Sequence, residues 1–389
     1  MRLTEEGSGK FLVISFFGTI FSLVFIFFVG VLFNFKNALK INICLNSRVK
    51  SVVKNYLKNE VLNNSILKLV SSKIADLTLK SLDKGVYLKG ETLIKMPKLP
   101  LISKLNEIAL EVKKFCYNCP YKAYFFVIPT KFQINGGFID SSSFFNYEQG
   151  ILQKLSASLD SCLVNLNNNI FSVNLKTSDF FFRTDNSINS FGSFFVYRSI
   201  LNQMGKSTYC MNNFRTVVCC NDFYGNLYSE QFANSVQSDT IHLFELGDLG
   251  DLGSSLINEK FEVEQIYSDN CIIKRHSIFD FSQLKFNNKI KVFFGDFAPI
   301  KILRRKRNYF SGDKLLIFSD GSADSLMQFL AYHFNNVVVV DLNEFKHVRN
   351  NVNKFLNEFK FVKFSHVLFM YNLESLTNAD FFDCLKYFY

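Results

Sequence analysis

The turn Asp320-Gly321-Ser322 combines a carboxylate, a glycine without a side chain, and a hydroxyl group. It follows Leu315–Phe318, an apolar run long enough for one buried strand, and precedes Ala323–Phe334, whose apolar residues recur at helical spacing. The β-branched run Val337–Val340 predicts a second buried strand. Together these pieces form a βαβ unit, which exposes its turn at the carboxyl end of the sheet. A serine in this position could act as a nucleophile if a base lay beside it.

The turn resembles the DHHW family, a branch of the SGNH-like hydrolases and acetyltransferases that also includes alginate O-acetylation proteins. In that family the turn reads roughly D-S-Y-A-N-S-L, and its first serine is the nucleophile. This chain matches the pattern at Asp320, Ala323, Ser325 and Leu326. The nucleophile position is Gly321, which has no side chain and cannot attack a carbonyl.

A second resemblance lies upstream. The family is named for T-D-H-H-W, followed by a small-residue segment and a glycine. This chain has Thr184-Asp185 and Gly192, but Asn186 and Ser187 replace the two histidines and Ile188 replaces the tryptophan. The resemblance implies that Asp185 is the surviving acid of an Asp-x-His pair, and that Ser187 stands at the base position.

Further segments resemble the family in the same order along the chain. They are Val127–Lys131, Asp222–Ser229, Ser238–Ile241 and Val367–Leu373. With the two motifs they cover Tyr121–Leu376. The resemblance implies an SGNH-like fold in which Asp185 and Gly321 lie close together, at the carboxyl edge of one α/β sheet.

The substitutions favour a catalytically inactive relative of polysaccharide O-acetyltransferases that acts in binding or assembly, because the nucleophile and base positions have both changed. The alternative is an active O-acetyltransferase or acetyl-esterase of envelope glycans that uses Ser322 and Asp185. A third hypothesis is a membrane protein whose cleft has no remaining ligand. We expect Ser322 to cap the helix that follows it, where its oxygen would accept a backbone N–H. None of the five histidines is obviously placed to replace the base.

The formal net charge of +10 and the pI near 9.0 favour contact with anionic polymers or lipid head groups. The densest basic run is Lys301–Arg307, which we expect to be a solvated loop, with a docking patch for acidic glycan or phospholipid as the alternative. We expect no nucleic-acid partner, because no helix-turn-helix, zinc-finger or RNA-binding signature occurs. The family resemblance implies envelope polysaccharide and a membrane-bound acyltransferase as partners.

The chain contains nine cysteines, and Cys116 and Cys119 form its only CxxC pair. A zinc site would need a second ligand pair at matching spacing, which Cys219-Cys220 does not supply. We therefore expect no metal and no cofactor. Ordinary thiols and a structural disulfide both stay open for Cys116 and Cys119.

The segment Phe11–Phe35 carries no charged residue over its whole length. At about 1.5 Å per residue it is long enough to span a bilayer core. It lacks a clear cleavage site, which favours an uncleaved single-pass anchor in the cell membrane. Lysines after the segment favour a cytoplasmic domain. The family resemblance implies an extracytoplasmic one, and we expect the latter.

The expected organisation is a tail over 1–10, the anchor over 11–35, a helical stalk over 36–105, and an α/β domain over 106–389 with a mixed β elaboration over 205–308. We expect the domain to be a doubly wound, mainly parallel sheet. Its strands are predicted at Tyr124–Ile128, Phe171–Asn174, Leu315–Phe318, Val337–Asp341 and Val367–Tyr371. Its helices are predicted at Asn146–Asn165, Gly192–Met204 and Asn343–Phe359. Strands of the elaboration are predicted at Arg215–Cys219, Thr240–Phe244, Cys271–Lys274 and Lys289–Phe294.

Overall fold

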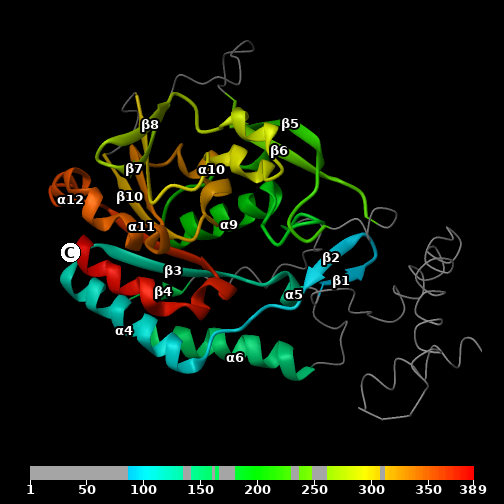
Figure 1. Cartoon of the computed structure of the whole chain (residues 1–389), viewed down its shortest axis with the longest axis horizontal. Coiled ribbons are helices and arrows are strands. Elements are labelled where there is room, and N and C mark those ends of the chain that lie inside the picture. The colour runs from blue at the N-terminus through cyan, green and yellow to red at the C-terminus, as the bar shows by residue number, and fades with distance from the viewer. Residues whose placement is uncertain are drawn as a thin grey trace, which may run out of the picture. The chain divides into compact units, whose positions relative to one another are not determined.

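A central sheet of eight strands organises the computed structural model, which describes residues 86–134, 142–159, 163–165, 180–228, 236–247, 261–306 and 312–389 (Figure 1). The strand order is β4-β3-β12-β10-β11-β9-β7-β8. The first five strands of this order pair in parallel, and the last three pair antiparallel. In that order the strands are Leu163–Asn165, Lys122–Ile128, His366–Asn372, Lys314–Ser319, Asn336–Val340, Ile300–Arg305, Phe261–Ser268 and Cys271–Arg275.

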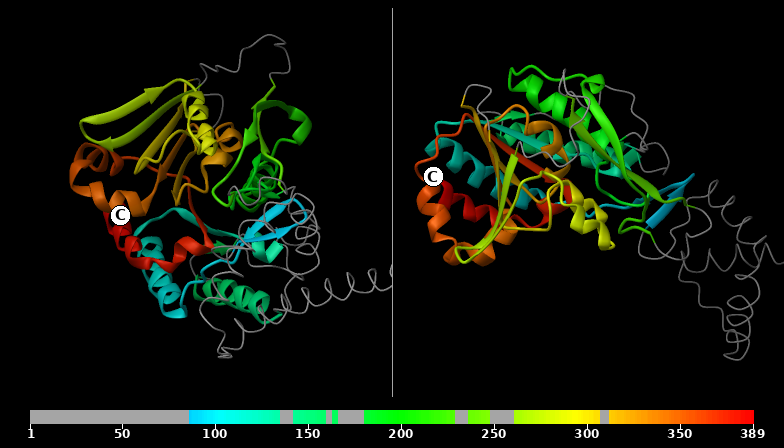
Figure 2. Two further views of the ribbon diagram at one scale, coloured as in Figure 1. Left: turned by 45° about the vertical axis from the view of Figure 1, so that its right-hand side comes forward. Right: turned by 90° about the horizontal axis from the view of Figure 1, so that it is seen from above.

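The central strands are buried on both faces, as expected for apolar runs in a parallel sheet. Alternate residues of β10 enter two different cores: Leu316 and Phe318 on one face, Leu315 and Ile317 on the other. Helices cover both faces (Figures 1 and 2). The first core is covered by α4 (Ile102–Asn118), α6 (Ser142–Leu159), α11 (Leu342–Val348) and α12 (Asn353–Phe359), and the second by α9 (Ser190–Gln203) and α10 (Met327–Leu330). The doubly wound arrangement is confirmed.

The predicted strands of the parallel part are present, except that Phe171–Asn174 lies outside the described residues. Two helix predictions need correction. The segment Asn146–Asn165 holds α6 followed by β4, and Asn343–Phe359 is divided into α11 and α12 by a 3₁₀ turn at Arg349–Asn351.

The predicted β elaboration has two parts. β5 (Phe214–Phe223) and β6 (Asp239–Leu246) form a separate antiparallel ribbon beside the central sheet (Figure 2). β7, β8 and β9 instead extend the central sheet. The predicted strand Lys289–Phe294 is wrong, because Lys289–Phe293 is a 3₁₀ helix, η5. A short apolar run does not by itself distinguish a strand from a helical turn.

The basic run Lys301–Arg307 was expected to be a solvated loop or a surface docking patch. Its first five residues instead belong to β9, which lies between β11 and β7 in the sheet. Lys301 is buried, and its Nζ lies 2.7 Å from Asp324 Oδ2. Arg304 pairs with Glu264 at 2.6 Å. Acidic partners distant in sequence therefore neutralise these charges.

Two strands are present before residue 106, the predicted start of the domain. β1 (Val86–Lys89) and β2 (Thr92–Lys95) form a hairpin, which corrects the predicted helical stalk at these residues. The Leu93 N–H donates to the Arg183 carbonyl at 2.9 Å. The predicted tail, the anchor Phe11–Phe35 and the stalk up to residue 85 lie outside the described residues. Among the helices that are described, none is long and apolar enough to cross a bilayer.

Candidate functional site

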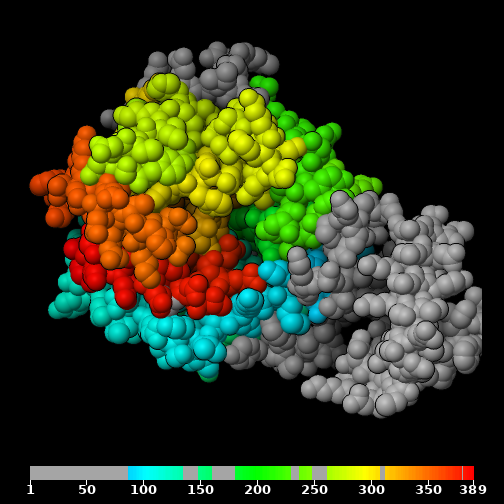
Figure 3. Space-filling model, viewed as in Figure 1, coloured from blue at the N-terminus to red at the C-terminus, as the bar shows by residue number. Residues whose placement is uncertain are grey.

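A cavity of about 390 Å³, the site cavity, lies where three parallel strands end. Ile128 ends β3, Asn372 ends β12, and the turn 320–322 follows β10; all three line the cavity. In Figure 3 the molecular surface is hollowed where the green, yellow and red segments meet. Carboxyl ends of parallel strands are the usual place for a binding site in an open α/β sheet.

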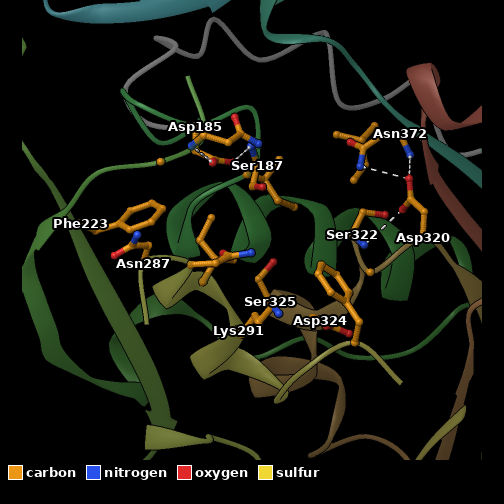
Figure 4. A pocket seen from close by; sticks show the side chains of 18 of the residues that line it. Asp185, Ser187, Phe223, Asn287, Lys291, Asp320, Ser322, Asp324, Ser325 and Asn372 are labelled. Carbon is orange, nitrogen blue, oxygen red and sulfur yellow. Dashed lines mark hydrogen bonds between the residues drawn. The ribbon is translucent and has the colours of Figure 1, made fainter. Parts of the chain in front are cut away.

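The structure brings the sequence-predicted site residues together. Asp185, Ser187, Gly321 and Ser322 all line the site cavity. Figure 4 shows Asp185 and Ser187 on one wall and Ser322, with Asp320, on another. The expectation that Asp185 and Gly321 share one edge of the sheet is confirmed.

The segment that carries Asp185 is fixed by buried polar contacts. Asp239 accepts from the backbone N–H groups of Arg183 and Thr184, at 2.7 and 2.8 Å, and from the Thr184 hydroxyl at 2.5 Å. The Lys131 ammonium donates to the carbonyl oxygens of residues 182, 183 and 185, at 2.6, 2.9 and 3.0 Å. Burial lowers the pKa of Lys131 to about 7, while Asp239 and Asp185 oppose this shift.

The Asp185 carboxylate is committed to backbone groups. Its Oδ1 accepts from the Ser187 N–H at 2.8 Å, and its Oδ2 accepts from the Asn226 N–H at 2.8 Å. The carboxylate therefore holds the 185–187 turn against the loop at 225–226. Among the described residues, no hydrogen bond joins it to a hydroxyl that it could activate.

Gly225 is the position where that loop approaches Asp185 most closely. A Cβ added at Gly225 would lie 2.3 Å from Asp185 Cβ and 2.7 Å from the Thr184 carbonyl oxygen. We expect Gly225→Ala to lower the free energy of unfolding by about 3 kcal/mol, because overpacking a closed contact forces a backbone shift. Urea denaturation would measure it.

Gly150→Ala is the matched control. An added Cβ at Gly150, inside α6, meets nothing within 4 Å. That variant should gain about 0.5–1 kcal/mol from helix propensity. Equal effects of the two substitutions would contradict the close contact at Gly225.

The turn after β10 is held in the same manner. Asp320 Oδ1 accepts from the Ser322 N–H at 3.2 Å, and Asp320 Oδ2 accepts from the Asn372 N–H and from the Ser375 hydroxyl. Both Asp320 oxygens are thus occupied. As at Asp185, the residue that matches the family pattern positions a loop.

Ser322 is not the helix cap that the sequence predicts. The Ser322 hydroxyl donates to the Met370 carbonyl at 3.3 Å. The Ala323 N–H donates instead to the Ser319 hydroxyl, at 3.1 Å. The helix predicted over Ala323–Phe334 is also shorter. A 3₁₀ turn at Asp324–Leu326 precedes α10, which ends at Leu330.

Gly321 has a backbone conformation suited to glycine, with φ of +86°. An added Cβ would contact only the Phe297 ring, at 3.4 Å. Space is therefore available for a side chain, while the left-handed backbone disfavours one by about 1–2 kcal/mol.

No histidine occurs among the described residues that line the site cavity. His333 Nε2 lies 2.8 Å from the Tyr197 hydroxyl in the core, and burial lowers the pKa of His333 to about 4. His276 and His347 are exposed at other positions. An imidazole base is therefore absent from this lining.

The sequence interpretation missed the opposite wall. Tyr224 and Phe297 line the cavity with 42% and 51% of their surfaces exposed. The Tyr228 ring packs on Tyr224, and the Lys291 ammonium lies 4.5 Å from the centre of the Phe297 ring, so part of each ring surface is left for a ligand. The adjacent Asn287 and Asn288, a turn-forming pair, line it as well. The Asn226 side chain also faces the cavity and has no hydrogen bond to the described residues. The asparagine pair could have indicated a loop at this wall of the cavity. It was overlooked because a strand was predicted directly after it, at Lys289–Phe294.

Asp324 lines the cavity at its buried end. Its Oδ2 pairs with Lys301, while its Oδ1 is buried without a hydrogen-bond partner among the described residues. Burial raises the pKa of Asp324, and Lys301 opposes this shift. An unsatisfied buried oxygen of this kind can take a ligand hydroxyl or a water molecule.

No protein-family model and no curated protein sequence matches the chain. Solved structures do match it. Bacillus cereus PatB1, solved with a sulfonyl adduct, superposes with a TM-score of 0.59 at 16% identity, covering 76% of this chain and 97% of that protein. A DHHW family protein from Eubacterium siraeum superposes with a TM-score of 0.56 at 14% identity, covering 77% of this chain and 94% of that protein. The resemblance inferred from the sequence is confirmed at the level of the fold.

Proposed function

We propose that this chain, which shares its fold with a DHHW family protein, is a catalytically inactive, glycan-binding relative anchored to the cell membrane by Phe11–Phe35. The site cavity would bind a polysaccharide of the cell envelope and leave it chemically unchanged. Its domain would lie outside the cytoplasm, where it could present the glycan to a membrane-bound acyltransferase.

The proposal rests on a contrast between two groups of residues: those that match the family pattern, and those at the family's nucleophile and base positions. Lys131, Thr184, Asp185, Asp239 and Asp320 hold backbone segments in place. The nucleophile position carries Gly321 and the base position carries Ser187, and neither can perform that role at neutral pH. Selection for a shaped cavity without selection for catalysis would produce this division.

The cavity lining suits sugars. Neutral amides such as Asn226 can donate to and accept from hydroxyl groups. The exposed faces of Tyr224 and Phe297 offer apolar surface for a sugar ring. A volume of about 390 Å³ lies within the range of small-molecule sites.

The alternative, an active O-acetyltransferase or acetyl-esterase using Ser322 and Asp185, is favoured by the presence of both residues in one cavity. Their contacts argue against it. The Ser322 hydroxyl donates to a backbone carbonyl, and the Asp185 oxygens accept from backbone N–H groups. Within the part of the chain that the structure describes, neither residue has a hydrogen bond to an imidazole or another general base.

Binding can be measured directly, because the chain contains no tryptophan. Phe297→Trp would place a single indole on the cavity wall. We expect its fluorescence to change saturably when oligosaccharides of β-linked N-acetylglucosamine, or of uronic acids, are added. Phe361→Trp is the control, because Phe361 is 88% exposed and does not line the cavity. A Phe297→Trp signal that responds to neither glycan up to millimolar concentration would overturn the proposed function.

A further inference from the structure

The site cavity continues beyond the lost catalytic positions. An adjoining cavity of about 530 Å³ shares Ser187, Asn226 and Asn372 with it, as well as Ile128. These shared residues form the junction between the two cavities. A ligand that fills one cavity therefore contacts side chains that also face the other.

The walls of the adjoining cavity come from different elements than those of the site cavity. The β1–β2 hairpin supplies Val86 and Lys95, the segment after β3 supplies Lys131, and the segment after β12 supplies Glu374. None of these four residues lines the site cavity. The adjoining cavity is thus a second compartment with its own recognition groups.

Some of its polar groups are open to a ligand. Lys95 and the Asn186 side chain line it and have no hydrogen bond or ion pair to the described residues. The Lys131 ammonium donates to three backbone carbonyls, so Lys131 helps to form the wall of the cavity but does not offer its N–H groups to a ligand. Glu374 accepts from the Lys98 N–H through Oε1, and its Oε2 has no hydrogen bond to any residue that the structure describes.

The charges of this compartment indicate the class of ligand. Lys95 and Glu374 place one positive and one negative group in this compartment, and the Lys131 ammonium already donates to backbone carbonyls. A polyanion would be attracted by one and repelled by the other, and the same holds for a polycation. An uncharged chain rich in hydroxyl and amide groups can hydrogen-bond to both.

We propose that one linear, uncharged oligosaccharide passes through both cavities and crosses between them over Ser187, Asn226 and Asn372. The proposal rests on the proposed function and extends it from a sugar-sized site to a groove for a chain. Each cavity alone has the size of a small-molecule site, so the pair holds several linked units. With Ser187 in place of the family's histidine, the side chain at the junction is smaller and uncharged.

The test is a ladder of chain lengths, using calorimetry on the full chain in detergent micelles. The probes are the disaccharide, tetrasaccharide and hexasaccharide of β-linked N-acetylglucosamine, with oligomers of uronic acid of the same lengths. We expect the tetrasaccharide to bind at least about tenfold more tightly than the disaccharide, because only it reaches the second compartment. We expect the neutral series to bind more tightly than the uronate series.

Substitutions can show whether the tighter binding of the tetrasaccharide depends on the adjoining cavity. Lys95→Ala and Asn186→Ala should each remove most of the difference between tetrasaccharide and disaccharide. Asn287→Ala, in the site cavity alone, is the matched control and should weaken both lengths by the same factor. Circular dichroism of each variant would verify that it is folded.

The outcomes separate the two proposals. Disaccharide binding with no gain on lengthening, or a gain that survives both Lys95→Ala and Asn186→Ala, would overturn the crossing groove and leave the proposed function standing. Tighter binding of the uronate series would overturn the assignment to an uncharged chain. If no saccharide of any length binds, the proposed function fails, and the groove fails with it.

Discussion

Replacing Lys131 by methionine is expected to lower the free energy of unfolding by about 2–6 kcal/mol, because two buried carbonyl oxygens lose their hydrogen-bond donor. Lys131 is 3% exposed, and each of its three N–H groups can serve one carbonyl oxygen. The Arg183 carbonyl would keep the Leu93 N–H as a donor. The carbonyls of Phe182 and Asp185 would lose the donor that Lys131 supplies, and each such loss costs about 1–3 kcal/mol.

The effect should also be local, and this distinguishes it from a general loss of packing. Hydrogen exchange should accelerate in the 182–187 segment and in the loop at 225–227, because Thr184 and Asp185 connect the two. Lys122→Met is the matched control, since Lys122 is an exposed lysine at the start of β3, the strand that precedes Lys131. We expect that variant to change stability by less than about 0.5 kcal/mol. If Lys131→Met cost no more than Lys122→Met, the ammonium would not be what holds the site segment.

The location of the site was predictable because it depends on topology. Leu315–Phe318 and Val367–Tyr371 are apolar runs typical of central strands, and the carboxyl ends of such strands meet at one edge in a parallel sheet. These two strands are neighbours in the sheet, and the Asn372 N–H donates to Asp320. The Thr184-Asp185 match placed the third segment at the same edge.

The errors concern residues whose state depends on partners distant in sequence. Lys301 and Arg304 lie in a basic run, but Asp324, in the 3₁₀ turn after β10, and Glu264, on β7, supply their counter-charges. Their long alkyl stems allow them to occupy a strand within the sheet. The residues that neighbour Lys301 and Arg304 in the sequence do not predict these ion pairs.

Ser319 and Ser322 illustrate the same limit at shorter range. Both are serines near the start of the turn, and either could accept the first N–H of the helical segment. The choice depends on Met370, on a neighbouring strand, whose carbonyl accepts the Ser322 hydroxyl. Only the tertiary structure decides which serine caps.

The wild-type protein is expected to show no serine-dependent hydrolysis or acetyl transfer above background. Gly321 offers no nucleophile, and neither Asn186 nor Ser187 can act as a base near pH 7. A fluorophosphonate probe should therefore leave the wild type unlabelled, and Ser322→Ala should behave identically. Labelling of the wild type that Ser322→Ala abolishes, in a folded protein, would show a live site and support the alternative function.

Restoring the family pattern should restore reactivity only when both groups return, because nucleophile and base act as a unit. The double variant Gly321→Ser with Ser187→His supplies a hydroxyl and an imidazole to one cavity. The space beside Gly321 admits the new side chain, since its Cβ would meet only the Phe297 ring at 3.4 Å. The positive φ at this position costs about 1–2 kcal/mol, which the fold must absorb.

We expect the probe to label the double variant at least about tenfold faster than either single variant, well short of the 10²–10⁴-fold that a positioned general base can supply. The reason for the shortfall is Asp185. Its Oδ1 already accepts from the backbone N–H of residue 187, so it is not free to orient a new imidazole. Gly321→Ala with Ser187→His is the control, because it keeps the backbone strain and the imidazole and lacks only the hydroxyl. Equal labelling of that control and the double variant would mean that the reacting group is not at position 321, and that the cavity is not a disarmed serine site.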